Sequence, residues 1–302
     1  MLLHALSAAI AALCIGVLLP ADGQASDNER DSIVSNGQSY VFNYGTASRA
    51  TGKPINDDTL FEIGSVSKTF TATLASYAEV DGKLSLADPV SKYLPALRGS
   101  HFGEVSLLSL GTHTPGGMPL QVPDEVTNDD QLMRYFQNWK PTFAPGTYRT
   151  YANPSIGLLG RVAAKSLNEG FGALMEGKLY PVLGLKDTYL NIPTSRLDDY
   201  AQGYTTKDAP IRMAPGVLMA ETYGVRTTAG DLVRFVEANM GMIALDEKWQ
   251  RAITNTHTGY YRVGGMTQDL IWEQYSYPVE LKTLLAGQFG RPHPQTQSRD
   301  QA

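Results

Sequence analysis

The hydrophobic pattern of the chain changes between residues 39 and 79 from strand-like to helical. Residues 39–45 combine aromatic and β-branched side chains and end in turn residues, which is typical of a β-strand. From Ser65 to about Glu79 the apolar residues recur at helical spacing. Four of them lie close to one helical face: Val66, Phe70, Leu74 and Tyr77. A strand region that gives way to a strong helix near residue 65 favours a mixed α/β (α+β) fold.

Three further segments have helical spacing, at about residues 128–139, 154–166 and 228–240. We expect Asn153 to cap the second of these helices, with Pro154 at its first position, because asparagine and proline favour those positions. Gly241 is the expected stop of the third.

Strand composition returns at residues 260–263 and 270–275. We therefore expect a mixed antiparallel sheet domain with an inserted helical domain. Its sheet parts are expected at about residues 39–64 and 224–287, and its helical part at about residues 65–223.

The N-terminal segment is typical of an export signal. Residues 2–19 contain no Asp, Glu, Lys or Arg, and Gly23 and Ala25 are small residues at the −3 and −1 positions of a cleavage site. Residues 1–25 are therefore expected to be a signal peptide that directs the chain to the periplasm. The alternative is an uncleaved membrane anchor, for which the apolar run is only marginally long enough.

Cleavage after Ala25 would remove Cys14, the only cysteine. It would leave a catalytic region at residues 26–287 and a polar tail, residues 288–302, that we expect to be disordered.

Composition excludes several classes of function. The 302 residues carry 25 Lys+Arg and 30 Asp+Glu, a net charge of −5 without a basic run, which argues against nucleic-acid binding. The five histidines form no H-x-H or H-E-x-x-H pattern, and no G-x-S-x-G, P-loop or dinucleotide motif occurs. We expect no metal and no organic cofactor. The expected partner is a small-molecule substrate, and the expected state is a monomer that no longer contacts the membrane after signal cleavage.

The tetrapeptide Ser65-Val66-Ser67-Lys68 stands where the strong helix begins. A serine in the first helical turn lies near unpaired backbone N–H groups, and a lysine three residues later lies on the same face. If the lysine were buried beside the serine, its amine could be partly neutral and accept the hydroxyl proton. The alternative is a capping serine with a solvated lysine.

Other segments make this motif more specific. Residues 61–70, which contain the motif, and Tyr151-Ala152-Asn153 resemble the serine β-lactamases and penicillin-binding proteins, whose motifs include S-x-x-K. The tyrosine in the second motif makes the class C, cephalosporinase-type enzymes the most similar. Four further segments are also similar to class C: residues 116–121, 214–218, 221–225 and 256–264. The resemblance extends from about residue 39 to residue 285.

The resemblance implies roles for individual residues. Ser65 would be the nucleophile that opens the β-lactam ring, Lys68 would orient and activate it, and Tyr151 would transfer protons. It does not decide whether Lys68 or Tyr151 is the principal base. A phenol near an ammonium group can have a lowered pKa and could then act as the base.

The resemblance also implies substrate contacts. Gln121 and Asn153 would bind the amide side chain of the substrate, and Tyr223 would form an apolar wall. Alternatives remain for each: Asn153 as a helix cap, Gln121 as a surface loop residue, and Tyr223 as a core aromatic. The Tyr-x-Asn pattern also occurs at Tyr189-Leu190-Asn191, so it is not specific by itself.

The sequence departs from the family at both ends. The Lys-Thr-Gly motif is absent, and Lys282-Thr283-Leu284 is the only similar string. Between residues 25 and 39 a short, largely polar segment stands where the family has a long helix and a first strand. A chain truncated at both ends is therefore expected to have an incomplete sheet, in which the strand at residues 39–45 lacks neighbours.

The expected function is hydrolysis of the β-lactam ring of cephalosporins and penicillins through a serine acyl-enzyme. One alternative is a D-Ala-D-Ala peptidase or esterase of the same fold. The other is an inactive remnant, because the missing strand would supply an oxyanion-hole donor, whose loss typically lowers the rate by a factor on the order of 10²–10³.

Overall fold

The structure is a computed structural model that describes residues 12–14, 30–35 and 38–276 of the 302-residue chain. Most of the expected signal peptide, the string Lys282-Thr283-Leu284 and the expected disordered tail lie outside the described residues. Within the described ranges, no helix combines the length and apolar character needed to cross a membrane.

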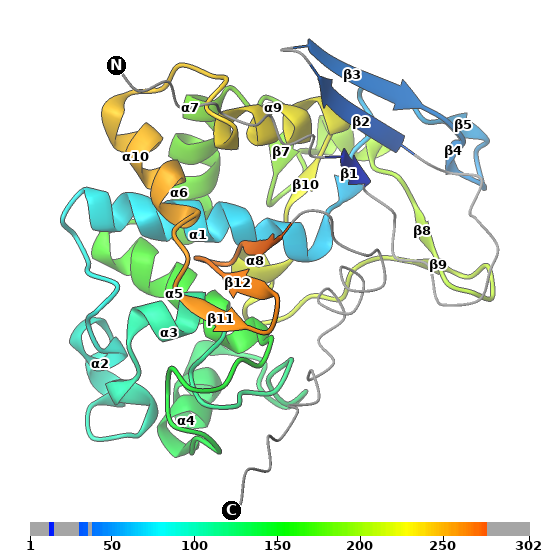
Figure 1. Cartoon of the computed structure of the whole chain (residues 1–302). Coiled ribbons are helices and arrows are strands. Elements are labelled where there is room, and N and C mark those ends of the chain that lie inside the picture. Colours follow the sequence, from blue (N-terminus) through cyan, green and yellow to red (C-terminus); the bar gives the residue numbers. More distant parts are fainter. Residues whose placement is uncertain (1–11, 15–29, 36–37, 277–302) are drawn as a thin grey trace, which may run out of the picture.

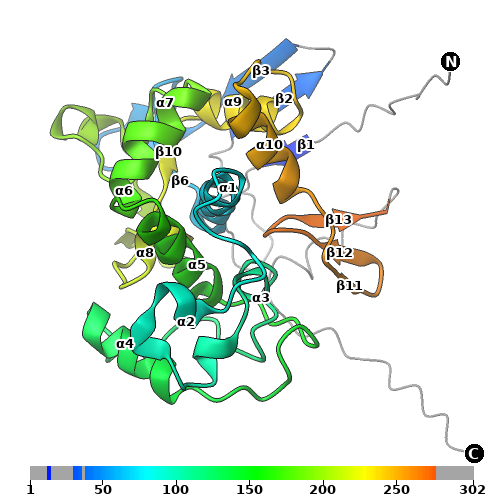
Figure 2. The same cartoon turned by 90° about the vertical axis from the view of Figure 1, so that its left-hand side faces the viewer.

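Helix α1 (Ser67–Val80) lies at the centre of the molecule, and Figure 2 looks nearly along its axis. It packs between α5 (Asn153–Ser166) and α10 (Glu247–Thr256), which come from later parts of the chain (Figure 1). The helix expected from residue 65 is thus confirmed, although its first turn, Gly64–Val66, is a 3-10 turn.

Helix α1 separates two apolar clusters, because both of its faces are buried. Phe70, Leu74 and Tyr77, which the periodicity places on one face, belong to the cluster shared with α10. Within that cluster Phe70 stacks on Phe235 with ring centroids 3.9 Å apart. The other face consists of small residues that pack in the second cluster with α5: Ala72, Ala75 and Ala78. Full burial makes α1 a rigid support for the residues at its N-terminal end.

The helical region lies on the α5 side of α1. It contains α2 (Val90–Tyr93), α3 (Leu107–Gly111) and α4 (Asp129–Asn138), which surround the second apolar cluster (Figure 1). The helix expected at 128–139 is α4, and the Asn128 side chain caps it by accepting a hydrogen bond from the Gln131 N–H at 3.0 Å.

Three more helices and a helical turn cover the other side of α1. They are α6 (Phe171–Leu174), the π-helical turn Met175–Leu179, α7 (Tyr180–Leu183) and α9 (Ala229–Asn239). The helix expected at 228–240 is α9, which is capped by the Thr228 side chain and ends before Gly241, where φ is +70°.

The N-terminal strand has neighbours, contrary to the expectation from sequence. Strand β3 (Gln38–Asn43) pairs antiparallel with β2 (Arg30–Ser35) over six residue pairs. Strand β1 (Ala12–Cys14), within the segment expected to be a signal peptide, pairs with the other edge of β2. The expectation of a strand without neighbours is wrong because residues 30–35 form a strand of their own. Asn-Gly at positions 36 and 37 is a strong sequence signal for a hairpin.

The remaining strands are short. A three-stranded sheet joins β6 (Phe61–Glu62), β10 (Arg226–Thr227) and β7 (Thr188–Tyr189), in that order. Two further antiparallel pairs are separate from this sheet: β4 (Thr46–Ser48) with β5 (Lys53–Pro54), and β8 (Gly203–Tyr204) with β9 (Pro210–Ile211). Strands β7, β8 and β9 thus lie within residues 65–223, which were expected to be helical.

A separate antiparallel sheet contains β11 (Tyr261–Val263), β12 (Met266–Gln268) and β13 (Glu273–Tyr275). It confirms strands near 260–263 and 270–275 but adds β12 between them. The second strand begins at Glu273, later than expected, because Ile271 has a positive φ of +71° that does not fit an extended strand. The mixed sheet-and-helix architecture expected from the sequence is therefore present.

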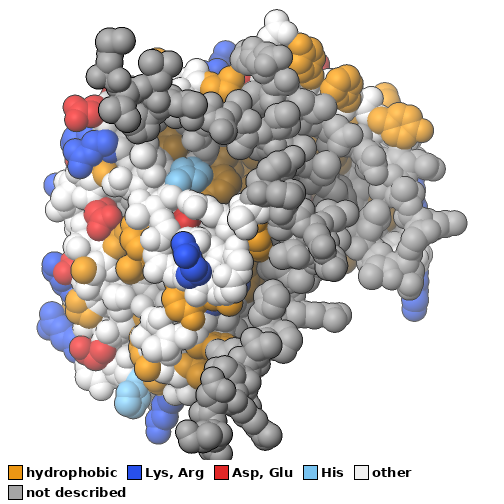
Figure 3. All heavy atoms as spheres, viewed as in Figure 1, with side chains coloured by type: hydrophobic (Ala, Val, Ile, Leu, Met, Phe, Trp, Pro, Cys, Tyr) orange, Lys and Arg blue, Asp and Glu red, His pale blue; other side chains and the backbone are white. Residues whose placement is uncertain are grey.

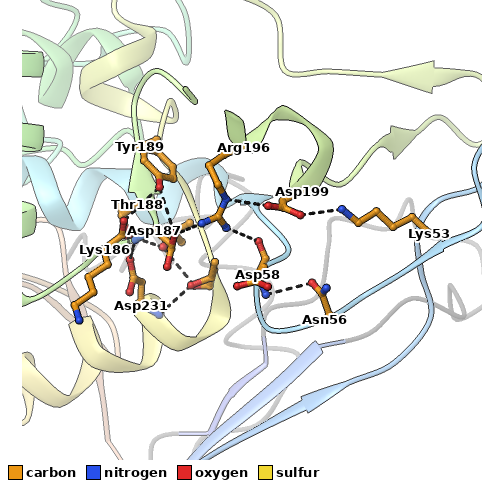
Figure 4. A network of polar contacts seen from close by, with 12 residues as sticks. Lys53, Asn56, Asp58, Lys186, Asp187, Thr188, Tyr189, Arg196, Asp199 and Asp231 are labelled. Atoms are coloured by element: carbon orange, nitrogen blue, oxygen red, sulfur yellow. Dashed lines mark hydrogen bonds and ion pairs between the residues drawn. The ribbon is translucent and has the colours of Figure 1, made fainter. Parts of the chain in front are cut away.

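A polar network joins segments that are far apart in sequence (Figure 4). Arg196 pairs with Asp187 and, at 2.9 Å, with Asp199, which also binds Lys53 at 2.8 Å. Arg196 also donates to the backbone carbonyl of Asp58 at 3.0 Å. The network thus holds residues 53–58 against residues 187–199. Residues 53–58 lead into β6 and, a few residues later, to Ser65.

On the face shown in Figure 3, basic and acidic side chains of the described residues are interspersed. They form no continuous basic area there, as a net charge of −5 without a basic run would suggest.

Candidate active site

Ser65 lies in the 3-10 turn that precedes α1. Ser65 is exposed, whereas the first residues of α1 are buried. The preceding Gly64 has φ +52°, a left-handed conformation that glycine adopts without strain. The Val66 N–H donates to the Ile63 carbonyl at 3.2 Å and closes the turn. The turn thus places one accessible hydroxyl at the N-terminal end of the buried helix α1.

Lys68 is the most unusual charged residue of the site, because its exposed fraction is only 2%. Its Nζ donates to Ser65 Oγ at 2.8 Å and to the Thr222 carbonyl oxygen at 2.9 Å. Burial lowers its pKa from 10.5 to about 7. The alternative of a solvated lysine is therefore wrong, and at neutral pH a large fraction of the amine is unprotonated and able to accept a proton.

Tyr151 completes the cluster from the loop that leads into α5. Its ring centroid lies 5.0 Å from Lys68 Nζ, and its hydroxyl is close enough to the Ser65 side chain for that group to lower the pKa of the phenol. Burial nevertheless raises the pKa of Tyr151 to about 12, which outweighs the lowering effect of Ser65. The expectation that a nearby ammonium would lower the pKa of this phenol is wrong. The reason is that burial of the phenol raises its pKa more than its neighbours lower it, and the Glu273 carboxylate raises it further.

Backbone hydrogen bonds hold the Tyr151 loop against residues 113–120. The Gly146 N–H donates to the Thr114 carbonyl at 2.8 Å, and the Asn153 N–H donates to the Leu120 carbonyl at 2.9 Å. Further bonds join Thr142 and Phe143 to Gly116. The position of the phenol is therefore set by a segment about 30 residues earlier in the chain.

Asn153 does not cap α5, contrary to the prediction. The helix begins at Asn153 itself, and the capping position is Ala152, which has no side-chain oxygen. Asn153 is 6% exposed, and its Oδ1 has no hydrogen-bond partner among the described residues. A buried, unpartnered amide oxygen is costly and calls for an explanation such as a ligand.

Gln121 and Tyr223 flank this cluster on separate loops. Gln121 is exposed and follows Leu120, whose carbonyl binds the Asn153 N–H, so it is a surface loop residue beside that backbone contact. Tyr223 is half-buried and follows Thr222, whose carbonyl binds Lys68. The second Tyr-x-Asn string begins in β7, where the Tyr189 hydroxyl contacts Asp187.

Sequence reasoning missed two polar groups near the phenol, Arg149 and Glu273. Arg149 pairs with Glu273 of β13 and also hydrogen-bonds Gln268 of β12, so it connects the Tyr151 loop to the C-terminal sheet. Both charges act on the pKa of Tyr151. No motif marks them, because their proximity depends on how β12 and β13 pack.

The assembled groups suit acyl transfer. An accessible alcohol, a partly neutral amine and a protonated phenol within contact of one another can supply a nucleophile, a base and an acid. In the part of the chain that the structure describes, no group of three His, Cys, Asp or Glu side chains is placed to hold a metal ion.

Comparisons with known proteins agree with this chemistry. The Beta-lactamase family model matches residues 32–293. The β-lactamase of Pseudomonas fluorescens is 53% identical over 256 residues, which cover 85% of this chain and 72% of that protein.

Two solved structures have the same fold. One is a β-lactamase/D-alanine carboxypeptidase from Pseudomonas syringae, with a TM-score of 0.82 at 54% identity, covering 85% of this chain and 72% of that one. The other is a class C β-lactamase in complex with cefoxitin, with a TM-score of 0.83 at 48% identity, covering 87% and 73%. With its fold, its motifs and these likenesses in agreement, the chain belongs to the β-lactamase family and is of the class C type.

Proposed function

We propose that this protein hydrolyses the β-lactam ring of cephalosporins and penicillins through an acyl-enzyme on Ser65. The observation that carries the proposal is the 2.8 Å contact between Ser65 Oγ and the buried amine of Lys68, whose pKa is about 7. An amine with this pKa is matched to general-base work at neutral pH.

In acylation, the Ser65 oxygen forms an ester bond to the β-lactam carbonyl carbon, and the neutral Lys68 amine accepts the hydroxyl proton. The carbon–nitrogen bond of the ring then breaks, and Tyr151 donates its phenolic proton to the leaving nitrogen. The Lys68 ammonium returns its proton to the phenolate. A pKa of about 12 keeps the phenol protonated at neutral pH, so Tyr151 acts as the acid and Lys68 as the principal base.

In deacylation, a water molecule attacks the ester carbon and the bond to the Ser65 oxygen breaks. The proton lost by water passes to the amine of Lys68, and the Lys68 ammonium then returns it to the serine oxygen. The site thus ends each cycle in its starting protonation state.

Three residues are proposed to bind the substrate. The unpartnered Oδ1 of Asn153 can accept a hydrogen bond from an amide N–H of the substrate side chain. Gln121 is proposed to bind the same amide group, and Tyr223 to form an apolar wall beside it. We also propose that the protein is a periplasmic monomer exported by a signal peptide at residues 1–25, on the basis of the apolar, uncharged segment 2–19.

A second candidate activity is that of a D-alanine carboxypeptidase, because the Pseudomonas syringae relative is named for both activities. The two activities share acylation and differ in how fast a penicilloyl ester is hydrolysed. A site that hydrolyses this ester slowly would be inhibited by penicillins rather than degrade them.

Nitrocefin hydrolysis and mass spectrometry after benzylpenicillin treatment test the proposal on the full chain. We expect hydrolysis by the unaltered protein, and loss of both hydrolysis and adduct in Ser65→Ala. The matched control is Ser67→Ala, which removes a fully buried hydroxyl that accepts from the Val225 N–H. It should still form the adduct.

Three results would contradict the proposal. A persistent adduct without turnover would favour the carboxypeptidase, and an adduct that survives in Ser65→Ala would reject Ser65 as the nucleophile. Absence of a cooperative thermal transition would instead indicate an inactive remnant.

A further inference from the structure

His113 lies against the ring of Tyr151, although no sequence motif singled it out. It follows α3 in the loop that supports the Tyr151 segment, and its exposed fraction is 1%. The two ring centroids are 4.6 Å apart, with an angle of 43° between the planes. A buried imidazole therefore shields one side of the proposed proton donor from water.

The same residue binds both chain neighbours of Tyr151. The Thr150 N–H donates to the His113 carbonyl oxygen at 2.8 Å, and the Ala152 N–H donates to His113 Nδ1 at 3.3 Å. The backbone is thus held immediately before and immediately after the phenol. A residue that fixes both flanking peptide groups limits the directions in which the phenol can point.

The protonation state of His113 suits this role. Burial lowers the pKa of His113 well below its usual value, and the charges of Arg149 and Lys68 act in the same direction. The imidazole is therefore neutral. Because Nδ1 accepts a hydrogen bond, the proton resides on Nε2, which is buried and has no partner among the described residues.

The backbone of His113 is also unusual, with a positive φ of +58°. A non-glycine residue in this region is strained and persists only where the surrounding contacts demand it, often at functional sites. The left-handed conformation here accompanies the two contacts with the Tyr151 loop.

We propose that His113 is a positioning residue that orients the Tyr151 phenol toward Ser65 and excludes water from it. This inference rests on the proposed role of Tyr151 as the proton donor. Among the described residues no hydrogen bond joins His113 to Ser65 or Lys68, and its contacts are with the Tyr151 ring and the flanking peptide groups, so it acts through Tyr151.

Two substitutions separate the contacts from the backbone conformation. His113→Asn keeps a residue that tolerates a positive φ and places Oδ1 where it can accept from the Ala152 N–H. His113→Gly also tolerates this φ but removes both the acceptor and the ring. His257→Asn is the matched control, because His257 is another histidine with lowered pKa and its Nε2 contacts Asn239.

A double-mutant cycle with Tyr151→Phe measures the coupling through nitrocefin turnover. We expect His113→Gly to lower kcat at least tenfold with KM changed less than threefold, and His113→Asn to restore most of the loss. In the Tyr151→Phe background, His113→Gly should change kcat less than twofold. An equal loss in both backgrounds, or no loss in either, would overturn the proposal.

A second measurement does not depend on activity. Titration of ¹³Cζ-labelled tyrosines by NMR, with the Tyr151 signal assigned from Tyr151→Phe, reports the pKa of the phenol directly. We expect the pKa of about 12 to fall toward 10 in His113→Gly, because water enters beside the ring. The charged groups that face Tyr151 are Lys68 on α1, Arg149 on its own loop and Glu273 on β13, and all three remain in this variant.

An unchanged titration in His113→Gly would overturn the positioning role. If the unaltered protein failed to hydrolyse nitrocefin while the titration shifted as expected, the proposed function would fail and the placement of Tyr151 by His113 would stand.

Discussion

Arg161 on α5 forms an ion pair with the buried carboxylate of Glu221, with 3.2 Å between Nε and Oε1. Glu221 is only 6% exposed, and its backbone carbonyl accepts from the Thr71 hydroxyl at 2.7 Å. The next residue, Thr222, supplies the carbonyl that binds Lys68. The ion pair therefore fixes the short α8 helix (Met219–Thr222), which holds the amine beside Ser65.

Removing this ion pair is expected to affect both stability and catalysis. Arg161→Ala would leave the Glu221 carboxylate buried without its partner, which costs on the order of 3–5 kcal/mol. We expect a lower Tm by thermal unfolding and a lower kcat, because α8 loses its anchor. Arg161→Lys, which keeps the charge, should lose less, and an unchanged Tm in Arg161→Ala would contradict this account.

The pKa of Lys68 predicts the pH dependence of acylation. Since the base must be unprotonated, the rate should rise with pH and level off above about pH 7, the pKa of the amine. Stopped-flow measurements of acylation between pH 5 and 9 record this rise in the pH–rate profile. Tyr151, with a pKa of about 12, should cause no fall in the rate within that pH range.

The same shift predicts how stability depends on pH. The pKa of Lys68 is about 7 in the folded protein and close to 10.5 in the unfolded chain, so the unfolded state binds more protons between these values. The free energy of unfolding should therefore rise with pH from about 7 to 10.5 through this group, and its destabilising effect should be fully present below pH 7. Denaturant unfolding of the unaltered protein and Lys68→Met checks this, and equal pH slopes would contradict it.

Gly216 provides a test of the position of Tyr223. A Cβ at residue 216 would lie 2.6 Å from the Tyr223 hydroxyl oxygen, so Gly216→Ala must displace that ring. We expect a several-fold higher KM with a smaller change in kcat, because the apolar wall moves while the catalytic groups stay. The double variant Gly216→Ala/Tyr223→Phe removes the clashing oxygen and should recover most of the loss. A KM unaffected by Gly216→Ala would place Tyr223 outside the substrate site.

Gly64 and Gly52 form a matched pair for testing the turn before Ser65. Both have positive φ, +52° and +68°, and a Cβ at either would meet no atom within 4 Å. Gly64→Ala and Gly52→Ala should therefore lower the free energy of unfolding by a similar amount, about 1–2 kcal/mol. Only Gly64→Ala should also lower kcat, because it adjoins the nucleophile. Equal activity of the two variants would show that the turn does not control the position of Ser65.

Local patterns predicted much of this protein. The helices α1, α4, α5 and α9 and the spacing that places Ser65 and Lys68 on one face follow from periodicity and capping within a few residues. The strand at β3 was predicted, but its partner β2 was not, because pairing depends on another segment rather than on the strand itself.

The chemical state of the site could not be read from these patterns. Whether Lys68 is solvated or buried depends on α5, α8 and α10 packing around α1, and burial is what moves its pKa to about 7. The pKa of Tyr151 and its contact with His113 likewise come from segments that are distant in sequence. Sequence alone determined which residues carry an alcohol, an amine and a phenol and which helix face presents the first two. The tertiary structure decided their hydration and mutual orientation, because desolvation depends on every segment that surrounds a group in space.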